Sequence, residues 1–148
     1  MRLDSVILRT GARMITPVLV VMSLYLVVRG HDAVGGGFIG GLTAGSAVVL
    51  YYFTKGSERI MPSRVLRYAP LVGTGLTLCL LYGLGGLVLG GAFLAGGKLT
   101  LPGGLEVAAS LVFDVGVYLI VVGLVTAIMR HLGFVADYAA RLPEVESA

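Results

Sequence analysis

Four long apolar stretches constrain the fold of this chain more than any other feature of its sequence. Each is roughly as long as the ~20 helical residues that cross the ~30 Å hydrocarbon core of a bilayer. The stretches cover about residues 10–29, 35–54, 68–94 and 107–130, and residues 131–148 follow as a tail. The pattern predicts an all-α integral membrane protein, with four transmembrane helices in a single domain, residues 1–148.

The composition of the chain supports the same conclusion. Hydrophobic residues make up 57% of its 148 residues and charged residues only 13%, whereas about 25% of an ordinary soluble domain is charged. A chain of this length cannot hide so much apolar surface in a core of its own, so we expect lipid to cover it. The single cysteine, Cys79, excludes an internal disulfide and a cysteine-based metal site.

Basic residues flank the apolar stretches and predict how the chain crosses the membrane. On one side of a four-span layout lie Arg2, Arg9, Arg13, Lys55, Arg59, Arg64, Arg67, Arg130 and Arg141. Only Arg29 and Lys98 lie on the other side. Because short cytoplasmic loops carry the excess of Lys and Arg, both ends and the tail are predicted to be cytoplasmic. The residues form no basic stripe with interleaved aromatics, so we expect no nucleic-acid binding.

The residues before the first span have an amphipathic pattern. Arg2, Arg9 and Arg13 fall on one face of a helix, and Leu3 and Ile7 fall on another. This pattern predicts a short N-terminal segment that lies in the membrane interface before it enters the bilayer.

Small residues recur at helical spacing in three of the spans. Gly37, Gly41 and Gly45 repeat every four residues in the second span, and Gly116 and Gly123 are seven apart in the fourth. Such faces allow the backbone of another helix to approach closely. The chain has more of this surface than four helices need among themselves, so we expect it to pack against other membrane subunits.

The glycine cluster also contains a literal dinucleotide-binding pattern, Gly35-x-Gly37-x-x-Gly40. A true fingerprint follows a β-strand and is followed about 20 residues later by an acidic residue. Here the pattern follows a membrane span, and no acid lies about 20 residues later on a second strand. We therefore expect no nucleotide, and the sequence has no metal-ligand cluster, so no cofactor is predicted.

Two residues at the external end of the first span are candidates for a site where ions or protons enter. His31 can titrate near neutral pH, and Asp32 can attract cations. The alternative is a loop turn, in which Asp32 stabilises the positive end of the following helix dipole. We favour the turn.

Asp114 is the only acidic residue inside a span and is the principal candidate for a functional site. Glu106, Ser110, Asp114 and Tyr118 are four residues apart and predict a polar stripe on one helix face, with Asp114 about a third of the way in from the external side. An ionised carboxylate in hydrocarbon is costly and must face protein or water. One interpretation is a relay for protons or cations. The other is an anchor between helices, and the sequence leaves both open.

Four blocks of residues resemble a known family. They are Leu8-Arg9-Thr10-x-Ala12-Arg13, Gly30-His31-Asp32-x-x-Gly35-Gly36-Gly37-Phe38-Ile39-Gly40-Gly41-Leu42, Leu101-Pro102-Gly103-Gly104 and Phe113-Asp114-Val115-Gly116-Val117-Tyr118. In order and spacing they resemble the B subunit of Mrp-type multisubunit cation/proton antiporters, the MnhB domain, over about Val6 to Gly133. The family often has proline where Val34 stands.

The resemblance implies a small, non-catalytic, four-span subunit of a large complex in the prokaryotic plasma membrane. The complex exchanges external protons for internal Na⁺, so the implied partners are other antiporter subunits, the lipid bilayer, Na⁺ and H⁺. The resemblance supplies no established functional residue, and Asp114, Glu106 and His31 remain candidates for the ion path. A purely structural subunit and a subunit of a membrane-bound hydrogenase are the alternatives, and a transporter that acts alone is disfavoured.

Overall fold

A computed structural model describes residues 6–30, 35–55, 67–88, 98–100, 106–108 and 110–146. Its elements are α1 (Val6–Arg29), α2 (Gly36–Lys55), α4 (Tyr68–Val88), β1 (Lys98–Thr100), β2 (Glu106–Ala108) and α5 (Ser110–Glu146). Within these ranges, four helices are long and apolar enough to cross a membrane. The expected all-α membrane architecture with four spans is therefore confirmed.

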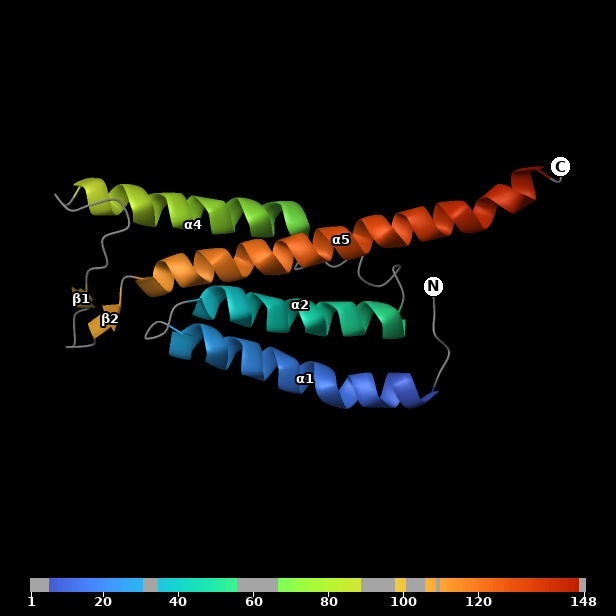
Figure 1. Cartoon of the computed structure of the whole chain (residues 1–148), viewed down its shortest axis with the longest axis horizontal. Coiled ribbons are helices and arrows are strands. Elements are labelled where there is room, and N and C mark those ends of the chain that lie inside the picture. Colours follow the sequence, from blue (N-terminus) through green and yellow to red (C-terminus); the bar gives the residue numbers. More distant parts are fainter. Residues whose placement is uncertain are drawn as a thin grey trace.

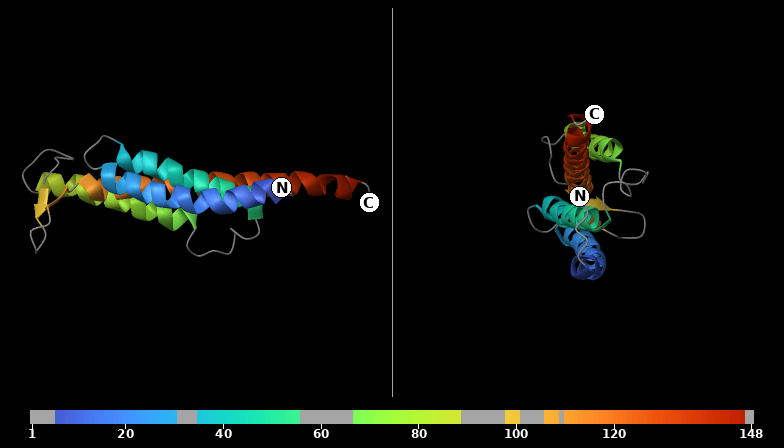
Figure 2. Two further views of the ribbon diagram at one scale, coloured as in Figure 1. Left: turned by 90° about the horizontal axis from the view of Figure 1, so that it is seen from below. Right: turned by 90° about the vertical axis from the view of Figure 1, so that its right-hand side faces the viewer.

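The four helices lie side by side in the order α1, α2, α5, α4. Helix α2 contacts α1 on one side and α5 on the other, and α4 packs on the opposite side of α5. Figure 1 shows that α2 and α5 run in the same direction, while α1 and α4 run the opposite way. Seen end-on in Figure 2, the helices form a row and not a closed bundle. Helices α1 and α4 therefore each have a broad outer face.

A short antiparallel hairpin precedes α5, at the end of the row where α1 ends and α2 begins (Figure 1). Its register pairs Lys98 with Ala108 and Thr100 with Glu106. The fourth span was expected to begin at about residue 107, whereas residues 106–108 are in β2 and α5 begins at Ser110. In β2, backbone N–H and C=O groups bond to β1, so they do not need the partners that a helical turn would provide.

The other helix ends also differ from the expected boundaries. Helix α4 ends at Val88, and residues 89–94, which were expected to continue the third span, lie outside the described part of the chain. The segment that was expected to be a tail continues α5 as a helix as far as Glu146. In Figure 2 this part of α5 extends beyond the other three helices. This extension contains Gly133 and, three residues before its end, Pro143.

Glycines on α2 allow close packing against α5. A Cβ atom at Gly41 would lie 2.8 Å from Cβ of Val121, and one at Gly45 would lie 2.9 Å from Cγ2 of Val125. Gly37 lies one turn earlier and contacts the backbone of α5 at Asp114. The three glycines that repeat every four residues thus line the α2–α5 contact.

A second set of small residues lies between α4 and α5. A Cβ atom at Gly75 would lie 2.6 Å from the carbonyl oxygen of Gly116, and one at Gly116 would lie 2.6 Å from Sγ of Cys79. One at Gly123 would lie 2.7 Å from Cγ2 of Val72. Cys79 therefore packs against α5, where its thiol is 3.8 Å from the carbonyl oxygen of Phe113.

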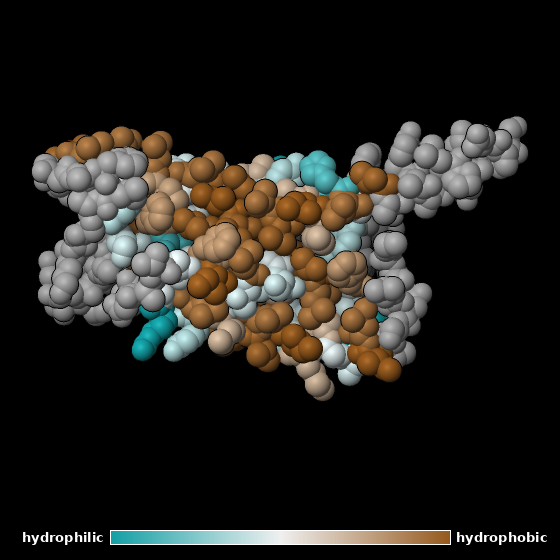
Figure 3. Space-filling model, viewed as in Figure 1, coloured by the Kyte–Doolittle hydropathy of each residue, from teal (hydrophilic) through white to brown (hydrophobic). Residues whose placement is uncertain are grey.

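The face of the row seen in Figure 3 is largely apolar between its two ends. Large exposed hydrophobic residues occur on all four helices, including Val18 and Val21 on α1 and Leu80 and Leu81 on α4. Exposed hydroxyl groups bond to their own helix, as in Thr77, whose Oγ1 donates to the carbonyl oxygen of Gly73 at 2.8 Å. Such a surface suits lipid, because each of these polar groups already has a partner.

Candidate functional site

Asp114 lies in the second turn of α5 and faces the first turn of α2. Its Oδ1 accepts a hydrogen bond from the backbone N–H of Gly37, with an N–O distance of 3.4 Å. The first four N–H groups of a helix have no partner within that helix, and Gly37 is the second residue of α2. The half-buried carboxylate therefore caps α2 from a different helix, where a negative charge also stabilises the helix dipole.

The glycine cluster makes this approach possible. A Cβ atom at Gly37 would overlap the backbone of Asp114, and one at Gly30 would overlap Cα of Gly36, so the chain is closely packed at both positions. Gly35 has a φ angle of 98°, which is unfavourable for residues with a side chain. Its carbonyl oxygen accepts the N–H of Ile39 at 3.0 Å and starts α2.

The same cluster also brings α1 against α2. A Cβ atom at Gly40 would lie 2.6 Å from Cγ2 of Val27 and 2.9 Å from the carbonyl oxygen of Ser23. Phe38, which lies between Gly37 and Gly40 in the sequence, is 52% exposed. Phe38 is thus on the outer surface of α2. Glycines of α2 form its contacts with α1 on one side and with α5 on the other.

A second polar contact lies one turn further along α5. The hydroxyl group of Ser23 on α1 donates to the carbonyl oxygen of Val20 at 2.7 Å, and its Oγ is 3.3 Å from the hydroxyl oxygen of Tyr118. Because the one Ser23 proton is used by Val20, Tyr118 donates to Ser23. Ser23 has no exposed surface. Tyr118 therefore joins α5 to α1, as Asp114 joins α5 to α2.

Sequence reasoning did not identify Ser23 or the Gly37 amide as part of this site. The only signal for Ser23 was a hydroxyl residue in an otherwise apolar run, and such residues commonly bond to their own helix. Nothing in the sequence indicated that a backbone N–H group of α2 would be the partner of Asp114.

The polar stripe that was expected on α5 is shorter than predicted. Glu106 is in β2 and does not share a helix with Ser110, Asp114 and Tyr118, so the prediction of a four-residue stripe is wrong. Ser110 is the first residue of α5. Asp114 is consequently about 6 Å along the helix from its start, and not a third of the way into the span. His31 and Asp32 lie outside the described residues.

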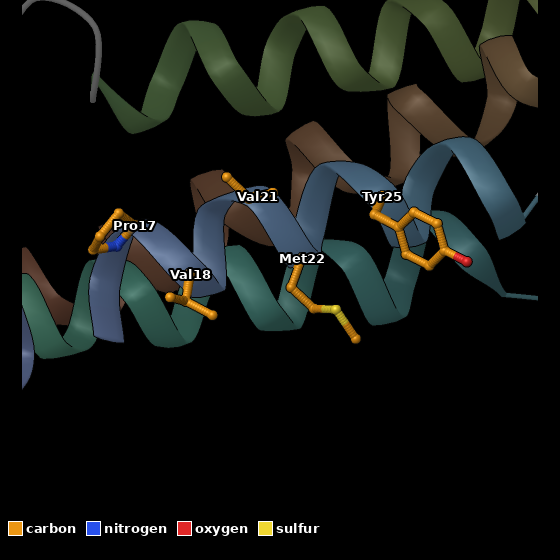
Figure 4. A pocket seen from close by; sticks show the side chains of 5 residues that line it. All are labelled: Pro17, Val18, Val21, Met22 and Tyr25. Atoms are coloured by element: carbon orange, nitrogen blue, oxygen red, sulfur yellow. The ribbon is translucent and has the colours of Figure 1, made fainter. Parts of the chain in front are cut away.

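The described ranges contain no candidate metal site. No group of three His, Cys, Asp or Glu residues there could hold a metal ion. An open groove on α1 is lined by Pro17, Val18, Val21, Met22 and Tyr25. Figure 4 shows that these side chains all come from the outer side of one helix. With no charged lining residue, this groove does not suit an ion.

Comparison with known proteins identifies the family of the chain. The domain family described as related to the MnhB subunit of Na⁺/H⁺ antiporter matches residues 7–127. The Na⁺/H⁺ antiporter B subunit of Bacillus subtilis (strain 168) is 35% identical over 134 residues, which are 88% of this chain and 94% of that protein. The chain belongs to the MnhB family. The resemblance inferred from its motifs is thereby confirmed.

Further comparisons agree with the MnhB assignment. The Na⁺/H⁺ antiporter B subunit of Alkalihalophilus pseudofirmus is 32% identical over 130 residues, which are 85% of this chain and 90% of that protein. A chain in the structure of the Mrp complex from Dietzia sp. DQ12-45-1b has a TM-score of 0.73 and 39% identity, over 86% of this chain. The match spans only 14% of that longer chain.

The MnhB match includes the whole polar site. Residues 7–127 contain Ser23, Gly37, Asp114 and Tyr118, the four residues that join α1, α2 and α5. The part of α5 after residue 127 lies beyond the matched range. The contacts around Asp114 thus belong to the MnhB domain itself.

Proposed function

We propose that this chain is the B subunit of a multisubunit Na⁺/H⁺ antiporter in a prokaryotic plasma membrane. The observation that carries the proposal is the MnhB match over residues 7–127, together with relatives named as antiporter B subunits over most of their length. These names do not favour a hydrogenase subunit. The apolar outer faces of the helical row support assembly with other membrane subunits.

Replacement of the corresponding subunit in a relative tests this function. The chain is expressed in a Bacillus subtilis strain that lacks its own antiporter B subunit, and everted vesicles are assayed for Na⁺-dependent collapse of a pH gradient. We expect the chain to co-purify with the other antiporter subunits and to restore the collapse. An assembled complex that contains the chain and has no Na⁺-dependent antiport would contradict the proposal.

We further propose that both ends of the chain are cytoplasmic. Nine Lys and Arg residues against two support this orientation. Asp114, in the second turn of α5, would then lie near the external side of the membrane, at the same end as the β1–β2 hairpin.

Within this function we assign Asp114 to the ion path, where its carboxylate would bind a proton or a cation in exchange. Its position one turn from the start of α5 supports access from the membrane surface. The hydrogen bond from Gly37 supports the alternative, an anchor between α2 and α5. The N–O distance of 3.4 Å is longer than the ~2.9 Å typical of such bonds, so this contact leaves the carboxylate able to bind other groups.

Two substitutions at one position separate these roles. Asp114→Asn removes the charge but keeps an oxygen that can accept the Gly37 N–H, whereas Asp114→Ala removes both. If Asp114 carries ions, Asp114→Asn assembles normally and loses most Na⁺-dependent antiport in vesicles. If Asp114 is only an anchor, Asp114→Asn retains normal antiport. Asp114→Ala then lowers the stability of the chain by about 0.5–2 kcal/mol, because this is the usual cost of replacing a residue that caps a helix by alanine.

A further inference from the structure

A cluster of cationic and aromatic side chains lies where α4 begins and α5 leaves the row of helices. The guanidinium carbon of Arg130 on α5 is 5.5 Å from the centre of the Tyr68 ring on α4. The ring of Tyr68 is 6.3 Å from that of His131, between ring centres. Arg67 directly precedes α4 and is exposed. Arg130 and His131 of α5 thus lie beside Tyr68 of α4, and Arg67 is the neighbour of Tyr68 in the chain.

The cluster has no acidic partner among the side chains that the structure describes. The one acidic side chain described there is Asp114, 16 residues before Arg130 on α5 and so about 24 Å away along the helix. The cation–π contact with Tyr68 needs no hydrogen-bond acceptor, and the Arg130 guanidinium has five N–H groups that can donate to a ligand. The edge of a guanidinium binds the oxygens of a phosphate group in pairs.

An apolar stripe continues from the cluster along the outer surface of α5. Leu124, Ile128 and Leu132 follow one another at four-residue spacing and are 55%, 46% and 57% exposed. His131 is also exposed and lies beside Leu132. The surface is therefore charged at one end and apolar along its length. A phospholipid has the same division, with its phosphate at the interface and its acyl chains in the hydrocarbon.

We propose that Arg67, Arg130 and His131 bind the phosphate of an anionic phospholipid, with Tyr68 holding the Arg130 guanidinium in place. Acyl chains would lie along Leu124, Ile128 and Leu132. Free inorganic phosphate would use the charged end alone and leave this stripe uncovered. Basic pockets between membrane helices commonly bind anionic headgroups, and each basic residue near the surface strengthens that attraction.

Lipid retention by the full chain tests the proposal. The chain is purified in a neutral detergent, incubated with phosphatidylglycerol or phosphatidylcholine, and analysed by native mass spectrometry. We expect preferential retention of phosphatidylglycerol. Arg130→Gln reduces that retention about fivefold, since one basic residue is removed from the headgroup site. Arg29→Gln is the matched control, because Arg29 is an exposed arginine at the opposite end of the row and should retain the lipid fully.

Two further arms distinguish the source of the phosphate and the alternative partner. Millimolar inorganic phosphate should not displace phosphatidylglycerol, and displacement would overturn the lipid assignment. Equal retention of both lipids, or an equal loss in Arg130→Gln and Arg29→Gln, would overturn the proposal as well.

An Arg130→Gln chain that retains phosphatidylglycerol fully but no longer assembles with other subunits would assign the cluster to an acidic side chain of a neighbour. Tyr68→Phe keeps the ring and should retain the lipid, which separates phosphate binding from a fault in folding.

Discussion

Two polar side chains of α5 each have a specific partner on another helix. Asp114 reaches the amide of Gly37, and Tyr118 reaches the hydroxyl of Ser23. In hydrocarbon a polar group without a partner costs several kcal/mol, so such pairs also determine which helices lie together. Asp114 and Tyr118 therefore help to hold α2 and α1 against α5, and Asp114 is also the candidate ion site.

The Ser23–Tyr118 contact predicts a measurable coupling. Ser23→Ala and Tyr118→Phe each remove one hydroxyl group, and the double variant removes both. We expect a coupling energy of about 0.6 kcal/mol in a double-mutant cycle, the average for hydrogen bonds between membrane helices. Unfolding of the purified chain in mixed detergent micelles measures it. Strictly additive effects of the two substitutions would show that the 3.3 Å contact does not stabilise the fold.

At the scale of elements, glycines decide how closely the helices approach. Gly41 and Gly45 place α2 against valine side chains of α5, and Gly75 places α4 against the backbone of α5. The periodicity of Gly37, Gly41 and Gly45 indicated a packing face, but it did not indicate which helix that face would meet. Helix α2 packs against α5, although α4 lies between them in the chain.

Two glycines of α4 that are two residues apart make a matched test of this packing. A Cβ atom at Gly75 would lie 2.6 Å from the carbonyl oxygen of Gly116, a backbone atom, while one at Gly73 meets nothing within 4 Å. We expect Gly75→Ala to destabilise the chain by about 1–3 kcal/mol, the usual cost of overpacking. Gly73→Ala should be neutral or stabilise it by up to about 1 kcal/mol, because alanine favours helix.

Thermal unfolding of the two variants in the same detergent compares these effects. A midpoint for Gly75→Ala at or above that of Gly73→Ala would show that α4 is not held against α5 as closely as described.

At the scale of the whole molecule, the row of helices leaves broad apolar faces on α1 and α4. A closed bundle would cover more of these side chains, of which Val18 and Val21 on α1 are 65% and 68% exposed. Lipid and other subunits of the antiporter can both cover such faces. The row therefore agrees with the proposed role as one part of a larger membrane complex.

The proposed orientation can be tested with the whole chain in intact cells. The one natural cysteine is removed by Cys79→Ser, and new cysteines are introduced singly by Arg2→Cys near the N-terminus and Arg29→Cys at the end of α1. A reagent that cannot cross the membrane should label the second variant and not the first, because the N-terminal end is predicted to be cytoplasmic. Labelling of the first and not the second would reverse the orientation, and permeabilised cells provide the control in which both are labelled.

The sequence by itself determined the number of membrane spans and the family of the chain. Charged groups are costly in hydrocarbon, so stretches of about 20 apolar residues identify helices wherever they stand. The motif around Phe113 and Asp114 identified the MnhB family without knowledge of any contact. Strand pairing hid one boundary, because β2 takes up residues 106–108 and Asp114 is therefore closer to the start of its helix.

Only the tertiary structure decided the partners of the polar side chains. The Asp114–Gly37 and Ser23–Tyr118 contacts join residues that are 77 and 95 positions apart, and no local pattern specifies which distant helices meet. One of the partners is a backbone amide, which every residue other than proline possesses and which therefore leaves no mark in the sequence. The order of the helices follows from how closely their glycine faces fit, and that fit exists only after folding.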